Sequence, residues 1–206
     1  MLLVNDSITI VLLGDWNKHY IQPEWVAKNV FEHPEMELGV ESRGIEFHVT
    51  YKKNNVTINP SQDKVVFTAS NVDQETLQFL TKSVNNYLEK ATTPQLVAYG
   101  FNADYVDSQT DVLADVFDSL SDTIPLIEMG FEIGSTKVSR KLIKDGRIIN
   151  MNCTLVGKTT NIHFNEHHEL NENHSVCITT AKIEEFISLT KDILLKLGYE
   201  FGGEED

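Results

Sequence analysis

The hydrophobic pattern of this chain repeats about halfway along its length, and this repeat constrains the fold more than any other feature. Residues 1–94 predict a strand, a short helix, three strands and a long amphipathic helix, and residues 95–201 give the same order again. A chain of 206 residues can bury a core without disulfides or a metal. We therefore predict an α+β protein with duplicated β-α-β-β-β-α halves and an acidic tail at residues 202–206.

Strands are predicted where apolar residues alternate or run together between turn residues. In the first half, Ile8–Leu13 ends at Gly14-Asp15 and indicates a buried strand. Further strands are predicted at residues 45–51, 56–58, 64–68, 96–99, 138–143, 148–156 and 160–170. Asn59-Pro60 is expected to break one of them, and Asp145-Gly146 is the strongest hairpin turn.

Helices are predicted where apolar residues recur at helical spacing. A short helix begins at Pro23, and residues 111–120 predict its counterpart in the second half. A long amphipathic helix ends each half. The residues predicted to cap these long helices are Asn71 or Asp73, then Thr180 and Gly198.

The two first strands also share a local string. Residues 11–21 and 97–106 both contain Gly, an aromatic residue, Asn, two further residues, Tyr and an aliphatic residue, once Asp15 is skipped. Because the string coincides with the repeated element order, the sequence favours an internal duplication. Two such halves can join their antiparallel sheets, with the helices packed on one face and the other face open.

The net charge and the cysteines limit which partners and which cellular compartment we expect. The net charge is −14, which argues against duplex DNA or an anionic membrane as a partner, and the second half holds nineteen acidic residues against nine basic ones. Cys153 and Cys177 form no C-x-x-C motif, and no N-terminal signal segment or bilayer-length apolar run is seen. We predict a cytoplasmic protein without membrane association.

Two resemblances follow from these patterns. Thr93-Pro94-x-x-x-Ala98-x-Gly100-x-Asn102, Asp145-Gly146-x-x-x-Asn150 and Phe164-Asn165-x-His167 together resemble a pattern in uncharacterised bacterial proteins of this size. That resemblance implies no activity and no functional residue. The repeated element order resembles the TATA-binding-protein-like saddle fold, whose DNA-binding members use a basic concave sheet that a charge of −14 does not supply.

Histidines gather on the last predicted strand, where His163, Asn165 and His167 share one face at period two. His163 and His167 would lie about 13 Å apart on an extended strand, too far to share one metal unaided. One interpretation is an exposed polar face bonded across the sheet. The alternative is an acid/base site of His163, Asn165 and His167, or a metal site of His163, His167 and Glu169, with Glu46 or His48 added from the first half.

Three other motifs have simpler interpretations. Val156-Gly157-Lys158-Thr159 resembles the end of a phosphate loop, but it lies between two strands and so predicts a hairpin turn. Cys153 alternates with apolar neighbours, which favours the core over a nucleophile, and no nucleophile signature surrounds Cys177. The basic stretch Lys137–Lys144 predicts a solvated strand, or a contact with phosphate or an acidic partner.

Aromatic residues recur at matching places in the two halves. Core packing is one explanation, and the other is that Trp16, Tyr20, Phe101 and Tyr105 anchor a partner. Because every catalytic constellation is incomplete, we predict a non-enzymatic protein-binding or scaffolding subunit that needs no cofactor and binds a protein partner or a second copy. The alternatives, in order, are an enzyme or metal site on the His163–His167 strand, a small-ligand pocket, and nucleic-acid binding.

Overall fold

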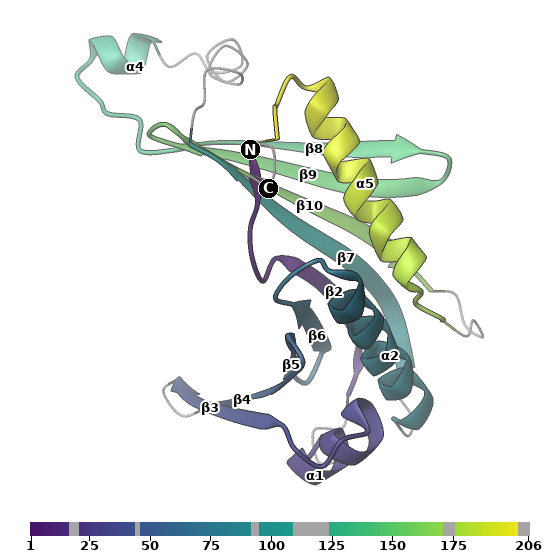
Figure 1. Cartoon of the computed structure of the whole chain (residues 1–206). Coiled ribbons are helices and arrows are strands. Elements are labelled where there is room, and N and C mark those ends of the chain that lie inside the picture. Colours follow the sequence, from purple (N-terminus) through teal and green to yellow (C-terminus); the bar gives the residue numbers. More distant parts are fainter. Residues whose placement is uncertain (17–20, 44–45, 92–94, 109–123, 171–175, 202–206) are drawn as a thin grey trace, which may run out of the picture. The chain divides into compact units, whose positions relative to one another are not determined.

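The structure is a computed structural model that describes residues 1–16, 21–43, 46–91, 95–108, 124–170 and 176–201 (Figure 1). The chain forms two compact units, which we describe separately. Unit 1 comprises Met1–Val4, Ala103–Glu166 and Ile187–Asp206, and unit 2 comprises Asn5–Asn102 and His167–Phe186. The boundaries at residues 102–103 and 166–167 fall inside strands and the one at 186–187 inside a helix, whereas the predicted second half begins at residue 95.

The described residues form ten strands and several helices. The strands are β1 (Leu2–Leu3), β2 (Ile8–Asp15), β3 (Glu37–Arg43), β4 (Glu46–Lys53), β5 (Val56–Pro60), β6 (Lys64–Ala69), β7 (Gln95–Asp107), β8 (Thr136–Lys144), β9 (Arg147–Val156) and β10 (Thr159–Glu169). The helices are α1 (Pro23–Val26), its π-helical continuation η2 (Ala27–Phe31), α2 (Gln74–Lys90), α4 (Ile124–Glu128) and α5 (Thr180–Lys196).

The strand order is β3-β4-β5-β6-β2-β7-β10-β9-β8, with β1 paired to β7. The pairings run antiparallel from β3 to β7 and from β10 to β8. The predicted α+β class and antiparallel sheet are therefore confirmed. In each half the first strand lies next to the last one, β2 beside β6 and β7 beside β10.

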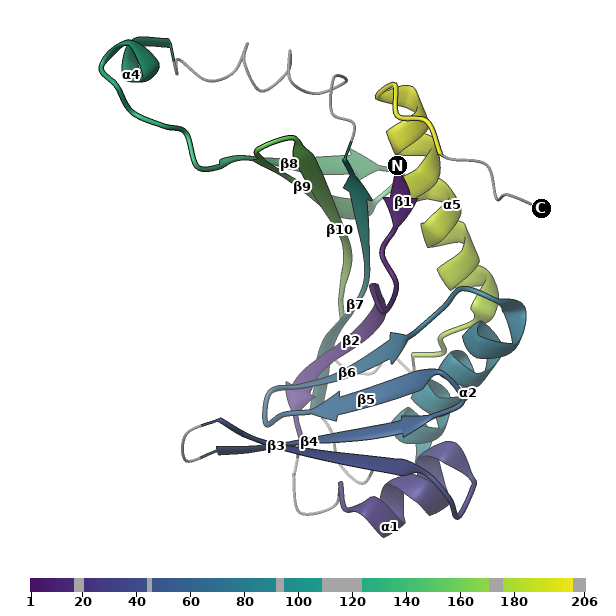
Figure 2. The same ribbon diagram turned by 60° about the vertical axis from the view of Figure 1, so that its left-hand side comes forward.

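In unit 2 the helices α1, η2 and α2 lie on one side of the strands β2 and β4–β6 (Figure 2). Asp73 begins α2 as predicted, because its carboxylate accepts a hydrogen bond from the Thr76 backbone N–H at 2.7 Å. Tyr87 of α2 packs its ring against Trp16, Trp25 and Phe67, all within 6 Å between ring centroids. This aromatic cluster is the centre of the unit 2 core.

In unit 1 the strands β8, β9 and β10 join through two tight hairpins. Asp145 and Gly146 both have positive φ, +52° and +79°, which suits the type I′ turn predicted for this pair. The core lies against α5, where the Tyr105 hydroxyl is 2.7 Å from the Thr190 hydroxyl. Gly198 ends α5 as predicted, with φ at +90°.

Three predicted details need correction or lie outside the described residues. Thr179, not Thr180, caps α5, since its hydroxyl accepts from the Lys182 N–H at 3.3 Å. Asn59-Pro60 does not break its strand, because β5 continues to Pro60 opposite Val65 of β6, whereas its pairing with β4 ends at Ile58. The helix predicted at residues 111–120 lies outside the described residues.

One strand was not predicted, and another is longer than predicted. β3 was not predicted, because its sequence mixes polar residues with Gly39 and shows no sustained apolar alternation, in keeping with the exposure of residues 37–42. β7 continues through Gly100 to Asp107, beyond the predicted end at Tyr99. Strand neighbours on both sides, β2 and β10, hold residues of low strand propensity in an extended conformation.

Candidate functional site

The open face of β8, β9 and β10 in unit 1 is built from rows of polar side chains. Ser139, Asn152 and His163 lie in one cross-strand row, because Asn152 pairs with both of the others. Lys141, Asn150 and Asn165 form the next row in the same way. Strand alternation puts Met151 and Phe164 on the opposite face, where both are buried.

Hydrogen bonds tie these rows together. Ser139 Oγ donates to Asn152 Oδ1 at 2.6 Å, and Asn150 Nδ2 donates to Asn165 Oδ1 at 3.2 Å. His163 Nδ1 is 2.7 Å from Asp104 Oδ1 of β7, which fixes the ring and leaves Nε2 as its second polar atom. The exposed polar face bonded across the sheet is the interpretation that the structure supports.

A shallow hollow of about 520 Å³ lies over these rows, and we call it the polar hollow. Its lining residues are Ser139, Arg140, Lys141, Asn150, Asn152, His163 and Asn165. The structure therefore brings His163 and Asn165 together, as predicted from their period-two spacing. Asp104 was missed, because it is 59 residues away from His163 in the chain.

The other predicted ligands are not gathered around His163. His167 and Glu169 belong to unit 2, as does His48 on the exposed face of β4, and Glu46 has no described side chain. Within the ranges that the structure describes, no three His, Cys, Asp or Glu side chains converge as a metal site would require. The predicted set of His163, His167 and Glu169 is thus not assembled in unit 1.

The predicted aromatic anchors also need correction. Trp16, Phe101 and Tyr105 are all buried, and Tyr20 lies outside the described residues. Trp16 leaves the end of β2 and packs on Tyr87, whereas Phe101 and Tyr105 lie on β7 and not on a turn. These side chains stabilise the core, and a partner cannot reach them without opening it.

The remaining motifs follow their simpler interpretations. Gly157 forms the β9–β10 turn with φ at +58°, so the Lys158 segment opens no helix. Cys153 is buried, and this burial raises the pKa of its thiol, whereas Cys177 is exposed. A raised thiol pKa is the opposite of what a nucleophile at position 153 would need.

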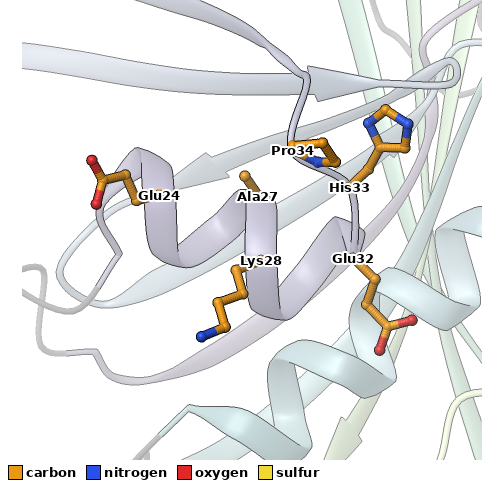
Figure 3. A pocket seen from close by; sticks show the side chains of 6 residues that line it. All are labelled: Glu24, Ala27, Lys28, Glu32, His33 and Pro34. Carbon is orange, nitrogen blue, oxygen red and sulfur yellow. The ribbon is translucent and has the colours of Figure 1, made fainter.

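A second hollow, of about 600 Å³, lies beside α1 and η2 in unit 2 (Figure 3). Figure 3 shows the carboxylates of Glu24 and Glu32 pointing away from each other. Glu32 instead bonds Lys82 at 2.9 Å and Lys90 at 3.0 Å, and these ammonium groups hold its pKa below the usual value. The polar groups here stabilise the η2–α2 contact and do not converge on a ligand.

An exposed apolar surface in unit 1 was not foreseen. Its large hydrophobic side chains are Leu126, Ile127, Met129, Phe131 and Ile133, all exposed, and we call them the α4 surface. Gly130, with φ at +88°, ends α4, while the N–H groups of Gly130 and Phe131 bond the carbonyls of Ile127 and Leu126 at 2.9 and 3.0 Å. These bonds form a Schellman motif, so this short segment has a defined shape.

The end of α5 provides a direct comparison within unit 1. There the N–H groups of Gly198 and Tyr199 bond the carbonyls of Leu195 and Leu194 at 3.1 and 3.0 Å, which is the same motif. In a Schellman motif the residue after the glycine often contacts an apolar residue of the last helical turn. Here that apolar pair is buried, since Leu194 is 0% exposed and Tyr199 is 1% exposed. The equivalent pair on α4 is open, with Leu126 43% exposed and Phe131 58% exposed.

The sequence matches no protein-family model, and no curated protein matches it either. None of the helices in the described part of the chain combines the length and apolar content needed to cross a bilayer. The fold and its two surfaces define the class, an acidic antiparallel α+β protein with an exposed apolar surface and a polar sheet face.

Proposed function

We propose that this protein is a non-enzymatic binding subunit that docks on a protein partner through the α4 surface. The observation that carries this proposal is the contrast between the two Schellman motifs of unit 1. In α5 the apolar pair of the motif packs in the core, and in α4 the same pair is held in shape but faces solvent. Ordered apolar groups on a surface are typical of an interface.

The charge of this segment indicates the kind of partner. Glu128 and Glu132 alternate with the apolar residues of the α4 surface, and the whole chain carries −14. A second copy would bring the same acidic residues against these carboxylates and be repelled. The partner we propose is a different protein that offers an apolar groove with lysine or arginine at its rim.

The experiment is site-specific photo-crosslinking in the native host. Benzoylphenylalanine replaces Phe131 in one variant and Leu195 in a matched control, because Leu195 is equally exposed on the far side of α5 from the core. We expect one protein to crosslink at position 131 and not at position 195. A salt titration of the purified pair follows, since a basic rim weakens binding as salt rises.

A second variant separates shape from hydrophobicity. Gly130→Ala keeps every apolar side chain but places an Ala at a φ of +88°, which costs about 1–2 kcal/mol and opens the turn. The crosslink at position 131 should then fall several-fold. Equal crosslinking from positions 131 and 195, or an adduct with a second copy of this chain, would disprove the proposed partner.

The alternative function, a metal or acid/base site on β10, is supported by one observation, the 2.7 Å hydrogen bond between His163 and Asp104. This alternative requires that the purified protein retain a metal or an activity that the His163→Ala variant loses. Elemental analysis of both proteins, prepared side by side, tests the metal form of this alternative. Unchanged metal content in the variant would exclude a metal held by His163.

We also infer that the two halves of the chain derive from one duplicated unit. What supports this is the strand order, which runs outward as β2-β6-β5-β4 in the first half and as β7-β10-β9-β8 in the second, with β3 added beyond β4 in the first half only. The shared string argues less strongly, since Gly14 lies at the end of β2 but Gly100 lies inside β7. Expressing residues 1–94 and 95–206 as separate chains tests it, and reassembly on mixing is the expected result.

A further inference from the structure

The polar face of β8–β10 differs in charge from the rest of the chain. Within unit 1, strand alternation places Lys137 and Lys141 on this face and no carboxylate from β8, β9 or β10. The neighbouring carboxylate, Asp104 of β7, is hydrogen-bonded to His163 and is a single negative charge against the two lysines. A chain with a net charge of −14 therefore has one face on which an anion meets ammonium groups.

The hydrogen bonds within the rows determine which atoms a ligand would meet. Asn152 Oδ1 accepts from Ser139, so the Asn152 amide N–H groups are the part of that side chain left to donate. Asn150 donates to Asn165, which leaves Asn150 Oδ1 as an acceptor. His163 donates from Nδ1 to Asp104, so Nε2 is the ring atom left for a ligand, and it is an acceptor when the ring carries a single proton.

The polar hollow thus combines a cationic donor and an amide donor with two acceptors. Lys141 and Asn152 suit an oxyanion, while His163 Nε2 and Asn150 Oδ1 suit hydroxyl groups that donate to them. A ligand that carries both an anionic group and hydroxyl groups can form hydrogen bonds with all four of these side chains. A simple anion would leave the two acceptors without a donor.

The size of the hollow selects a small molecule. The two rows are about 7 Å apart along the strands and span two strand spacings, about 10 Å. The hollow of about 520 Å³ lies within the range of small-ligand sites. No Phe, Tyr or Trp side chain lies on this face in the described part of β8, β9 or the unit 1 part of β10, so stacked nucleic-acid bases are not favoured.

We propose that the polar hollow binds a small hydroxylated phosphate of the sugar-phosphate type. The phosphate lies against the Lys141 ammonium and the Asn152 amide, and the hydroxyl groups donate to His163 Nε2 and Asn150 Oδ1. This site is independent of the α4 surface, and either can exist without the other. No reaction is assigned to it.

The test is a titration of the isotope-labelled full chain, followed by the side-chain amide signals of its asparagines. The probes are glycerol 3-phosphate and glucose 6-phosphate, with inorganic phosphate and glucose as controls. We expect either sugar or polyol phosphate to shift the signals of Asn150 and Asn152 at millimolar concentration. Each control should bind at least about tenfold more weakly, because it lacks half of the matching groups.

Two variants locate the binding. Lys141→Met should weaken it about tenfold, since one charge-assisted contact is lost, whereas Lys144→Met on the same strand should leave it unchanged because residue 144 faces away from the hollow. His163→Gln should weaken binding of the polyol phosphates and leave inorganic phosphate unaffected. Lys141 and Lys144 are both exposed, so neither variant threatens folding.

The outcomes are decisive in both directions. Shifts that disappear with Lys141→Met but persist with Lys144→Met support the site. Absence of any shift with both polyol phosphates overturns it. Equal affinity for inorganic phosphate also overturns it, because the hydroxyl contacts would then contribute nothing. An equal loss of affinity in the two lysine variants overturns it as well, because the ligand would then bind elsewhere.

Discussion

The ion pair between Arg147 and Glu166 gives the sharpest stability prediction. Arg147 Nε and Nη2 donate to the two oxygens of Glu166, each at 2.8 Å, in a bidentate arrangement. The Glu166 side chain is only 2% exposed, whereas that of Arg147 is 29% exposed. Removing the arginine therefore leaves a buried carboxylate, while removing the carboxylate leaves a cation that can reach water.

The magnitude follows from this asymmetry. Loss of one partner from a buried pair costs about 3–5 kcal/mol, and the partial exposure of Arg147 places Arg147→Met near the lower limit, about 3 kcal/mol. Glu166→Met should cost about 1 kcal/mol, because the freed guanidinium turns to solvent. The double variant Arg147→Met/Glu166→Met should recover most of the loss, since no unpaired charge stays buried.

Urea unfolding followed by far-ultraviolet circular dichroism measures all four proteins. Dichroism is preferred because both tryptophans, Trp16 and Trp25, belong to unit 2, whereas the ion pair belongs to unit 1. Fluorescence recorded in parallel shows whether the units unfold together, which the free-energy comparison requires. Equal costs for the two single variants, or a double variant as unstable as the sum of both, would refute the reasoning.

Three further predictions follow from single residues. In the native protein a thiol reagent should modify Cys177 rapidly and Cys153 only on unfolding, because burial shields Cys153 and raises its pKa; counting two fast thiols would contradict this. Asp73→Ala should lower the melting temperature at neutral pH. The Thr76 N–H depresses the folded-state pKa of Asp73 below 3.8, so the effect should vanish as the pH falls through that pKa, and a constant difference in acid would exclude the cap. Gly198→Ala should cost about 1–2 kcal/mol in urea unfolding because of its φ of +90°, and an unchanged midpoint would show that α5 can end differently.

The local elements were predictable because their determinants lie close together in the chain. The Asp145-Gly146 turn, the Asp73 cap and the Gly198 end of α5 each depend on a few neighbouring residues and their allowed φ angles. The amphipathic stripes of α2 and α5 likewise record which side of each helix is buried. The α+β class follows from these elements taken together.

The candidate sites depended on contacts that no local pattern records. His163 had a predicted face, but its partner Asp104 lies on a strand whose predicted end was too early by several residues. Aromatic residues occur both in cores and at interfaces, so residue type alone did not assign Trp16, Phe101 and Tyr105. Their burial in the structure assigns them to the core. The α4 surface escaped notice because a string of apolar residues in sequence normally predicts burial.

The sequence by itself therefore determined the helices α1, α2 and α5, the hairpins of β8–β10, the acidic balance and the polar face of β10, since each depends on residue type and spacing. Tertiary structure alone decided that β7 extends between two neighbours, that Asp104 orients His163, and that the Leu126–Phe131 pair stays open while Leu194–Tyr199 is covered. The physical reason is that burial and cross-strand register arise from residues distant in the chain, and their free energy exists only once the sheet has formed.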